Sequence, residues 1–285
     1  MSFDISHPEV RAAIEQALAE DIGSGDITTN LCVPAHTRAT GRLVAREELT
    51  LAGVELLDPI FEKVAERLNL GRCEFSLRCG SGTDLKNGSE IAIVCGPARV
   101  LLTAERTALN FLQRLSGVST VTHAYVDAIK GTHARILDTR KTTPGLRQLE
   151  KMAVAAGGAT NHRVGLFDAI LIKNNHITAS GGVSAALERT HGAEVPVEIE
   201  VRSKDELEEA LAAGARHLLL DNLTPGVARE WVAYIAGRAT VELSGGITLE
   251  TVRAYAESGA DFISIGALTH SAPAVDINFG LEMEG

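Results

Sequence analysis

Six short apolar runs follow one another along the second half of the chain, and each ends in polar residues. They lie at residues 136–141, 169–176, 197–201, 217–222, 240–246 and 262–267. Runs of this kind are typical of parallel strands that are buried on both faces. Their midpoints recur at roughly 20 to 30 residues, which suits one strand and one helix per unit with right-handed connections. The pattern predicts an α/β fold with a parallel β/α barrel, whose chemistry lies at the carboxyl ends of the strands.

Six strands are fewer than the eight of a complete barrel. We therefore expect an irregular or incomplete β/α barrel that is closed by a strand without a clear sequence signal. An open, doubly wound sheet is the second structural interpretation.

The first half of the chain has a different pattern. Residues 8–20 form an amphipathic stripe with proline at the permitted first turn, and the glycines that follow end the helix. Strand-like stretches at residues 40–46, 74–78 and 90–94 then surround another helical segment, at residues 54–68. This half is expected to be an α+β sandwich domain.

A long helical pattern begins near residue 99 and runs to Lys130, with an expected break at Ser116 and Gly117. The predicted domains are an N-terminal sandwich, a barrel, and a tail that packs back on the sandwich, over residues 1–115, 116–271 and 272–285.

The composition limits the classes of partner. The formal net charge of −10 argues against nucleic acid and anionic membranes, which need broad basic surfaces. The four cysteines form neither a CxxC pair nor a disulfide framework, so a reduced, cytoplasmic protein is expected. No apolar run is long enough to span a bilayer, and the first residues do not resemble a secretory signal.

Basic residues cluster at the predicted ends of the early strands. They are Arg140, Lys141, His162, Arg163 and Lys173. Such side chains around one cavity would bind a small ligand that carries carboxylates or phosphates.

Acidic and small residues follow the later strands. Glu200 and Asp221 end adjacent runs, and two carboxylates beside bound phosphates most often hold Mg²⁺. The loops after the last two strands hold Ser244-Gly245-Gly246 and Gly266-Ala267, whose small side chains let backbone N–H groups approach a phosphate.

Each element also has an ordinary structural interpretation. Ser-Gly-Gly alone is usually a tight turn, and Glu200 or Asp221 alone could cap a helix or form a salt bridge. His176 and His270 are expected to be hydrogen-bonded loop residues, because no second histidine or cysteine stands at ligand spacing. The functional interpretation is favoured because these features fall at the same end of successive strands.

Several long motifs resemble the quinolinate phosphoribosyltransferase family. They are EDIGSGDITT, ERTALNFLQRLSG, DTRKTTPGLR, GGATNHRVGLFDAILIKNNH, LLLDN, ELSGGI and SIGALTHS. The resemblance implies an enzyme that joins quinolinate to phosphoribosyl pyrophosphate with Mg²⁺ and releases pyrophosphate and carbon dioxide, leaving nicotinate mononucleotide for NAD biosynthesis. It also implies a homodimer, or a higher oligomer, whose active sites are shared between subunits.

Site residues carry over by motif. The resemblance implies that Arg140, His162, Arg163 and Lys173 hold quinolinate, with Arg106 reaching in from the partner subunit. It places Thr139, Lys141, Glu200, Asp221, Ser244, Gly245, Gly246, Gly266, Ala267 and His270 at the substrates, with catalytic roles for Lys141, Lys173, Glu200 and Asp221 and metal binding for Glu200 and Asp221. Two departures, Ala159 for a glycine and Asn174 for an acidic residue, affect local loop geometry only.

Other functions stay open from the residues alone. A Schiff-base aldolase would also place a lysine at a strand end, but it needs one desolvated lysine rather than a cluster of several arginines. A non-enzymatic barrel is disfavoured because paired carboxylates beside many cations are costly to assemble. A phosphoribosyltransferase paralogue associated with molybdenum transport shares much of the pattern and could use another acceptor.

Overall fold

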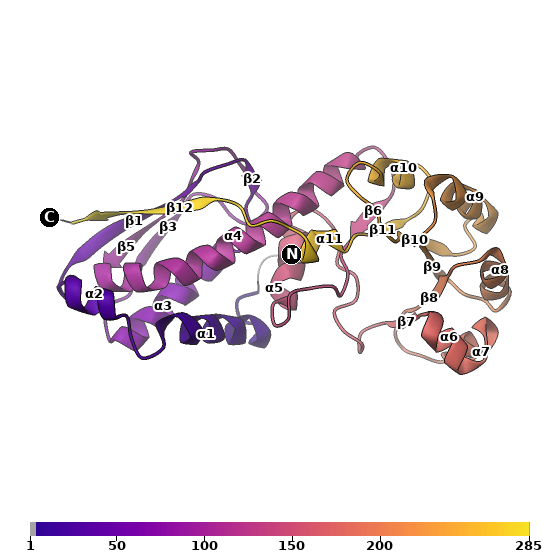
Figure 1. Cartoon of the computed structure of the whole chain (residues 1–285), viewed down its shortest axis with the longest axis horizontal. Coiled ribbons are helices and arrows are strands. Elements are labelled where there is room, and N and C mark those ends of the chain that lie inside the picture. The colour runs from indigo at the N-terminus through magenta and orange to yellow at the C-terminus, as the bar shows by residue number, and fades with distance from the viewer. Residues whose placement is uncertain (1–3, 285) are drawn as a thin grey trace. The chain divides into compact units, whose positions relative to one another are not determined.

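The computed structural model describes residues 4–284, which form two compact units (Figure 1). Among these residues, the first unit comprises everything up to residue 123, residues 142–158 and everything from 268 onward, and the second comprises 124–141 and 159–267. The first unit is thus built from three separate stretches of chain rather than from one range and a tail. Residues 1–3 and 285 of the predicted domains lie outside the described residues.

The first unit is organised around an antiparallel sheet with the strand order β12-β1-β5-β3. These strands are β1 (Arg38–Ala45), β3 (Glu74–Leu77), β5 (Glu90–Pro97) and β12 (Ile277–Met283), and a separate pair consists of β2 (Leu49–Thr50) and β4 (Asp84–Leu85). The alternating burial of β1 shows that only one face of this strand belongs to the core. The last strand of the chain therefore completes a sheet that begins near residue 38.

Helices supply the other layer of this unit. They are α1 (Pro8–Ile22), α2 (Ile27–Cys32), the 3-10 turn η1 (Val54–Leu56), α3 (Leu57–Leu68), α4 (Ala98–Ala128) and α5 (Arg147–Ala156). Phe61 of α3 meets Phe75 of β3 and Phe279 of β12 edge to face, with ring centroids 5.3 and 6.2 Å apart. These contacts join helix and sheet into the expected α+β sandwich.

The expected break in the long helix was wrong, because α4 runs without interruption through Ser116 and Gly117. The buried Ser116 hydroxyl accepts a hydrogen bond from the backbone N–H of Ala52 and donates one to its carbonyl. Gly117 lies against the backbone of Pro273, where a β-carbon would overlap the carbonyl oxygen. Ser116 and Gly117 therefore allow close packing against the helix. In the sequence alone, the same two residues resemble the end of a helix.

The second unit contains one six-stranded parallel sheet with the order β6-β11-β10-β9-β8-β7. Its strands are β6 (Arg135–Leu137), β7 (Ile170–Ile172), β8 (Val197–Val201), β9 (His217–Asp221), β10 (Thr240–Ser244) and β11 (Phe262–Ser264). All six predicted strands are confirmed, and in Figure 1 they follow one another as an arc with helices along its outer side. Within the described chain, β6 and β7 end the ladder, so the barrel is incomplete as expected, but the additional closing strand that we expected is not found there.

Helices connect the strands of this sheet. They are α6 (Asn174–Ser180), α7 (Val183–Glu188), α8 (Lys204–Ala212), α9 (Pro225–Ile235) and α10 (Val252–Ala256), whereas α11 (Ala267–His270) follows β11 and has residues 268–270 in the first unit. Side-chain caps begin two of them: the hydroxyl of Ser203 accepts from the N–H of Glu206, and that of Thr224 from the N–H of Val227. No helix in residues 4–284 is long and apolar enough to cross a membrane.

Candidate active site

Strand register places an unusual set of polar side chains on one face of the parallel sheet. Glu200 of β8 lies beside Leu219 of β9, which lies beside Glu242 of β10, and Glu242 is level with Phe262 of β11. Because side chains alternate between the faces of a strand, every second residue from these positions shares their face. That face therefore carries Lys173, Glu198, Asp221, Ser244 and Ser264.

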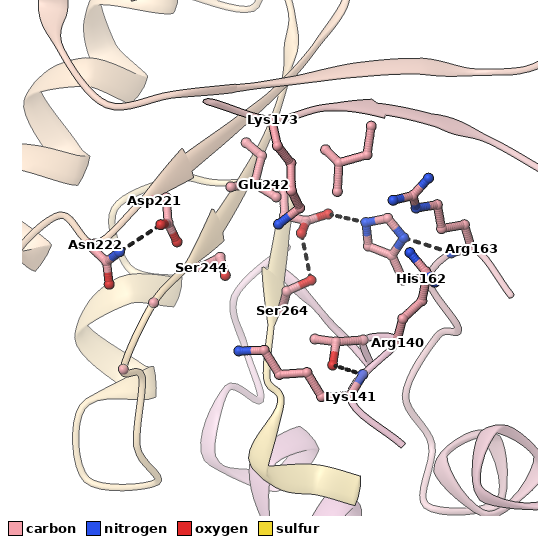
Figure 2. A pocket seen from close by; sticks show the side chains of 15 residues that line it. Arg140, Lys141, His162, Arg163, Lys173, Asp221, Asn222, Glu242, Ser244 and Ser264 are labelled. Carbon is pink, nitrogen blue, oxygen red and sulfur yellow. Dashed lines mark hydrogen bonds and ion pairs between the residues drawn. The ribbon is translucent and has the colours of Figure 1, made fainter. Parts of the chain in front are cut away.

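A cavity of about 530 Å³ lies over this polar face (Figure 2). It is lined by Thr139, Arg140, Lys141, His162, Arg163, Leu171, Lys173, Leu219, Asp221, Asn222, Glu242, Ser244, Gly245, Gly246 and Ser264. The structure thus brings together all five predicted cations with Thr139, Asp221 and the Ser-Gly-Gly loop.

Charge is separated within the cavity. Figure 2 shows Arg140, Arg163 and His162 on one side and Asp221, Asn222 and Ser244 on the other. Burial and the neighbouring Arg140 lower the pKa of Arg163, which reflects two guanidinium groups held close together. Such a pair of like charges favours an anionic ligand between them.

The loop after His162 holds Arg163 in place. The Asp168 carboxylate accepts hydrogen bonds from the N–H groups of Val164 and Gly165, at 2.7 and 2.9 Å. Arg163 donates from Nη1 to the Ala169 carbonyl at 3.0 Å. The guanidinium is therefore positioned before any ligand enters.

Lys173 marks the end of β7 and the start of α6. Its backbone N–H donates to Nδ1 of His176 at 2.9 Å. His176 is hydrogen-bonded as predicted, but it lies in the first turn of α6 and not in a loop. The Lys173 Nζ lies 3.3 Å from Oε2 of Glu200, whose side chain is 10% exposed. Glu200 itself is not among the cavity-lining residues, and it reaches the site through this ion pair.

The opposite wall is a tight turn between two strand ends. Asn222 has a positive φ of 56°, and it donates from its backbone N–H to the Ser244 carbonyl at 2.9 Å and from Nδ2 to Asp221 at 2.6 Å. Gly245, with φ of 99°, lies directly against Asn222. The glycine is required here because any side chain would displace the turn that orients Asp221.

A buried cluster lies at the floor of the cavity. Nε2 of His162 is 3.3 Å from Oε2 of Glu198 and 3.4 Å from Oε2 of Glu242, and Ser264 donates to Glu242 at 2.6 Å. Burial disfavours charge on His162, but its hydrogen bonds to the two glutamate carboxylates outweigh it and raise the pKa of His162 to about 9. Burial also raises the pKa of Glu198.

Sequence reasoning missed Glu198, Glu242, Ser264 and Asn222 as site residues. The signal that could have found the two glutamates is an acidic residue inside an otherwise apolar buried strand, as in VEIEV and TVELS. Period-two alternation places Glu198 on the same face as Glu200, which alone had been selected.

Besides Glu200, four predicted residues are not among those that line the cavity. Gly266 and Ala267 follow β11 in the second unit. His270 and Arg106 belong to the first unit and are exposed, and His270 Nδ1 lies 2.6 Å from the Ser271 hydroxyl. Their assignment to the substrates stays a prediction.

Two family descriptions match nearly the whole chain. "Quinolinate phosphoribosyl transferase, N-terminal domain" matches residues 26–116, and "Quinolinate phosphoribosyl transferase, C-terminal domain" matches residues 118–280. The chain belongs to the quinolinate phosphoribosyltransferase family. The resemblance found in the motifs and the prediction of an enzyme are thereby confirmed.

Similar members of the quinolinate phosphoribosyltransferase family are known from several bacteria. The nicotinate-nucleotide pyrophosphorylase [carboxylating] of Mycobacterium leprae is 42% identical over 99% of this chain and 100% of its own length. A probable nicotinate-nucleotide pyrophosphorylase [carboxylating] of Bacillus subtilis is 38% identical over 98% of this chain and 96% of its own. The crystal structure of NadC from Streptococcus pyogenes, 37% identical, matches with a TM-score of 0.92 over 100% of both chains.

Proposed function

We propose that this enzyme transfers phosphoribosyl from phosphoribosyl pyrophosphate to quinolinate, releasing pyrophosphate and CO₂ and forming nicotinate mononucleotide. One observation carries the proposal: a single cavity has a guanidinium pair on one side and a carboxylate with a glycine turn on the other. Family membership supports the reaction class, and the separated charges support a division of the cavity between the two substrates.

The basic side suits a pyridine with two adjacent carboxylates. Arg140 and Arg163 offer forked donors that match carboxylate geometry, and Lys173 adds a flexible ammonium. Leu171 and Leu219 give the aromatic ring an apolar surface within the same cavity. A dicarboxylate would therefore replace the mutual repulsion of the cations with paired charges.

The other side suits the phosphates. The backbone N–H groups of the turn at Gly245 and Gly246 can approach a phosphate closely, and Lys141 supplies a cation nearby. We assign the 5-phosphate of the substrate to this turn and the diphosphate to Lys141 and Asp221.

The carboxylates fit a Mg²⁺ that takes part of its ligand set from the diphosphate. Asp221 lines the cavity, and Glu200 lies on the adjacent strand and on the same face. Mg²⁺ is usually held by one or two carboxylates together with substrate phosphates, so these two carboxylates would be sufficient protein ligands. The bound ion would neutralise charge on the departing pyrophosphate.

The chain's own residues then account for the chemistry. Breaking the ribose–pyrophosphate bond builds positive charge on the ribose, which the carboxylate of Asp221 or Glu200 stabilises. Attack by the ring nitrogen makes that nitrogen positive. The electron pair of the adjacent C–CO₂⁻ bond can then stay on the ring as CO₂ leaves, so no organic cofactor is needed. Lys173 or Lys141 orients the departing carboxylate or delivers the proton that replaces it.

The Schiff-base alternative loses support from the structure. A Schiff-base lysine reacts as a neutral, desolvated amine. The Lys173 side chain is instead 53% exposed and ion-paired with Glu200, so it is not desolvated.

The decisive experiment offers phosphoribosyl pyrophosphate and Mg²⁺ with either quinolinate or nicotinate. Quinolinate should give nucleotide and CO₂ in equal amounts. Nicotinate lacks the carboxylate beside the ring nitrogen and leaves part of the cationic side unpaired, so its turnover should be lower by about 100-fold or more. Comparable turnover of nicotinate, or binding of phosphoribosyl pyrophosphate without quinolinate turnover, would assign a different acceptor.

We also propose a cytoplasmic homodimer in which Arg106 serves the partner's cavity. Arg106 lies on the exposed side of α4, and the first unit therefore presents a cation that its own contacts do not bury. A shared site would add a further donor to the carboxylate side.

A further inference from the structure

His162 lies between two glutamates that its role as a substrate ligand does not explain. Its Nε2 approaches Glu198 at 3.3 Å and Glu242 at 3.4 Å, and the three side chains are only 14%, 16% and 5% exposed. Ser264 occupies the second oxygen of Glu242. The glutamates come from β8 and β10, so two strands that are not neighbours converge on one ring nitrogen.

The other nitrogen of the ring is also occupied by the protein. The backbone N–H of Arg163 donates to Nδ1 of His162 at 2.6 Å. The backbone N–H of His162 donates to the fully buried Asp138 at 2.7 Å. Both ring nitrogens are therefore committed before an acceptor enters, and one of them fixes the main chain of Arg163.

We infer that Glu198 and Glu242 are positioning residues for acceptor binding, which hold the His162 ring so that it fixes Arg163 at the cavity. This inference rests on the proposed function, because the affected ligand is quinolinate. It assigns His162 an indirect role: the ring supports a guanidinium that contacts the substrate.

The protonation of the ring is consistent with this arrangement. The glutamates raise the pKa of His162 to about 9 against the effect of burial, whereas the N–H directed at Nδ1 opposes a second ring proton. The hydrogen bonds to the glutamates favour a ring with a proton on both nitrogens, whereas the N–H at Nδ1 favours a neutral ring. In both forms Nε2 carries a proton, which lies between the two carboxylates. The inference rests on the contacts of the two ring nitrogens, and it requires a proton on Nε2 but not a particular total charge.

A metal ion is the competing occupant, because His162, Glu198 and Glu242 could each offer one ligand atom. The separations of 3.3 and 3.4 Å suit hydrogen-bonded groups, and they equally suit ligand atoms that each lie about 2.0 to 2.2 Å from one tetrahedral ion. Metal analysis of the purified enzyme distinguishes the two.

The test compares two double variants. Glu198→Met with Glu242→Met removes every acceptor from Nε2 at similar volume. Glu198→Gln with Glu242→Gln removes the charge but keeps an acceptor oxygen at each position. The control is Glu208→Met, at an exposed position on α8. Quinolinate and phosphoribosyl pyrophosphate are titrated separately by calorimetry, and thermal unfolding checks that each variant is folded.

The double methionine variant should bind quinolinate about ten-fold more weakly, the size expected for losing a charge-assisted hydrogen bond. Its affinity for phosphoribosyl pyrophosphate should change by less than about two-fold. The double glutamine variant should recover most of the loss, and ¹⁵N spectra should show a proton on Nε2 of His162 in the wild type.

Equal weakening of both ligands, unchanged quinolinate binding, or no recovery with glutamine would overturn the inference. One equivalent of metal that is lost in the methionine variant would also overturn it. The wild-type assay separates the two proposals: no quinolinate turnover rejects the proposed function, whereas normal turnover with unaffected variants rejects only the positioning role.

Discussion

Gly245→Ala should damage the phosphate side of the cavity in a way that its neighbour does not. Gly245 has φ of 99°, and an added β-carbon would lie 2.7 Å from the backbone nitrogen of Asn222 and would overlap its side-chain oxygen. Backbone strain at a positive φ costs about 1 to 2 kcal/mol. Overpacking against backbone costs about 1 to 3 kcal/mol more. The free energy of unfolding should therefore fall by about 2 to 5 kcal/mol.

Gly246→Ala is the matched control. Gly246 has φ of 60°, and an added β-carbon would have no neighbour within 4 Å, so only the backbone strain of about 1 to 2 kcal/mol applies. The difference between the variants isolates the contact with Asn222, which also orients Asp221.

Urea unfolding measures both changes. The only tryptophan of the chain, Trp231, lies on α9 in the second unit, so its fluorescence reports the unit that carries the turn. Phosphoribosyl pyrophosphate should also bind Gly245→Ala at least about ten-fold more weakly, while quinolinate is less affected. Equal destabilisation by the two substitutions would refute the role of the close contact.

Three further predictions follow from named positions. Arg163→Ala should weaken quinolinate by about 2 to 5 kcal/mol and phosphoribosyl pyrophosphate far less, and Asp221→Asn should do the reverse in titrations with Mg²⁺; equal losses for both ligands would contradict the division of the cavity. Arg106→Ala and Lys173→Ala, each nearly inactive alone, should regain about a quarter of wild-type activity after random subunit exchange if the site is shared, and none if each site is built from one chain. Gly117→Ala should lower the unfolding midpoint because a β-carbon would overlap a carbonyl oxygen of the C-terminal segment, and an unchanged midpoint would show that α4 can shift.

The strands of the barrel could be predicted from the sequence because each is an apolar run that ends at a turn. The cations of DTRK and AILIK could also be predicted to meet, because each group follows a strand and successive parallel strands share one carboxyl edge. His162 and Arg163 lie in the loop before β7, so this argument does not place them. These inferences need only local pattern and the handedness of βα units.

The cluster of His162, Glu198 and Glu242 could not be predicted in this way, because the register between strands determines which side chains meet. Glu198 and Glu242 lie on non-adjacent strands, and only the ladder of β8, β9 and β10 shows that they face one histidine. The continuity of α4 through Ser116 and Gly117 was likewise missed, because its cause is packing against residues more than 60 positions away.

The pairing of β12 with β1 has a consequence for synthesis on the ribosome. Seven residue pairs join these strands, from Ala39 with Met283 to Ala45 with Ile277. The first unit therefore cannot complete its sheet until translation has passed the whole barrel. Until then β1 presents an open edge, which could pair with a neighbouring nascent chain. Conditions that slow translation after residue 267 should thus expose this edge for longer and increase aggregation.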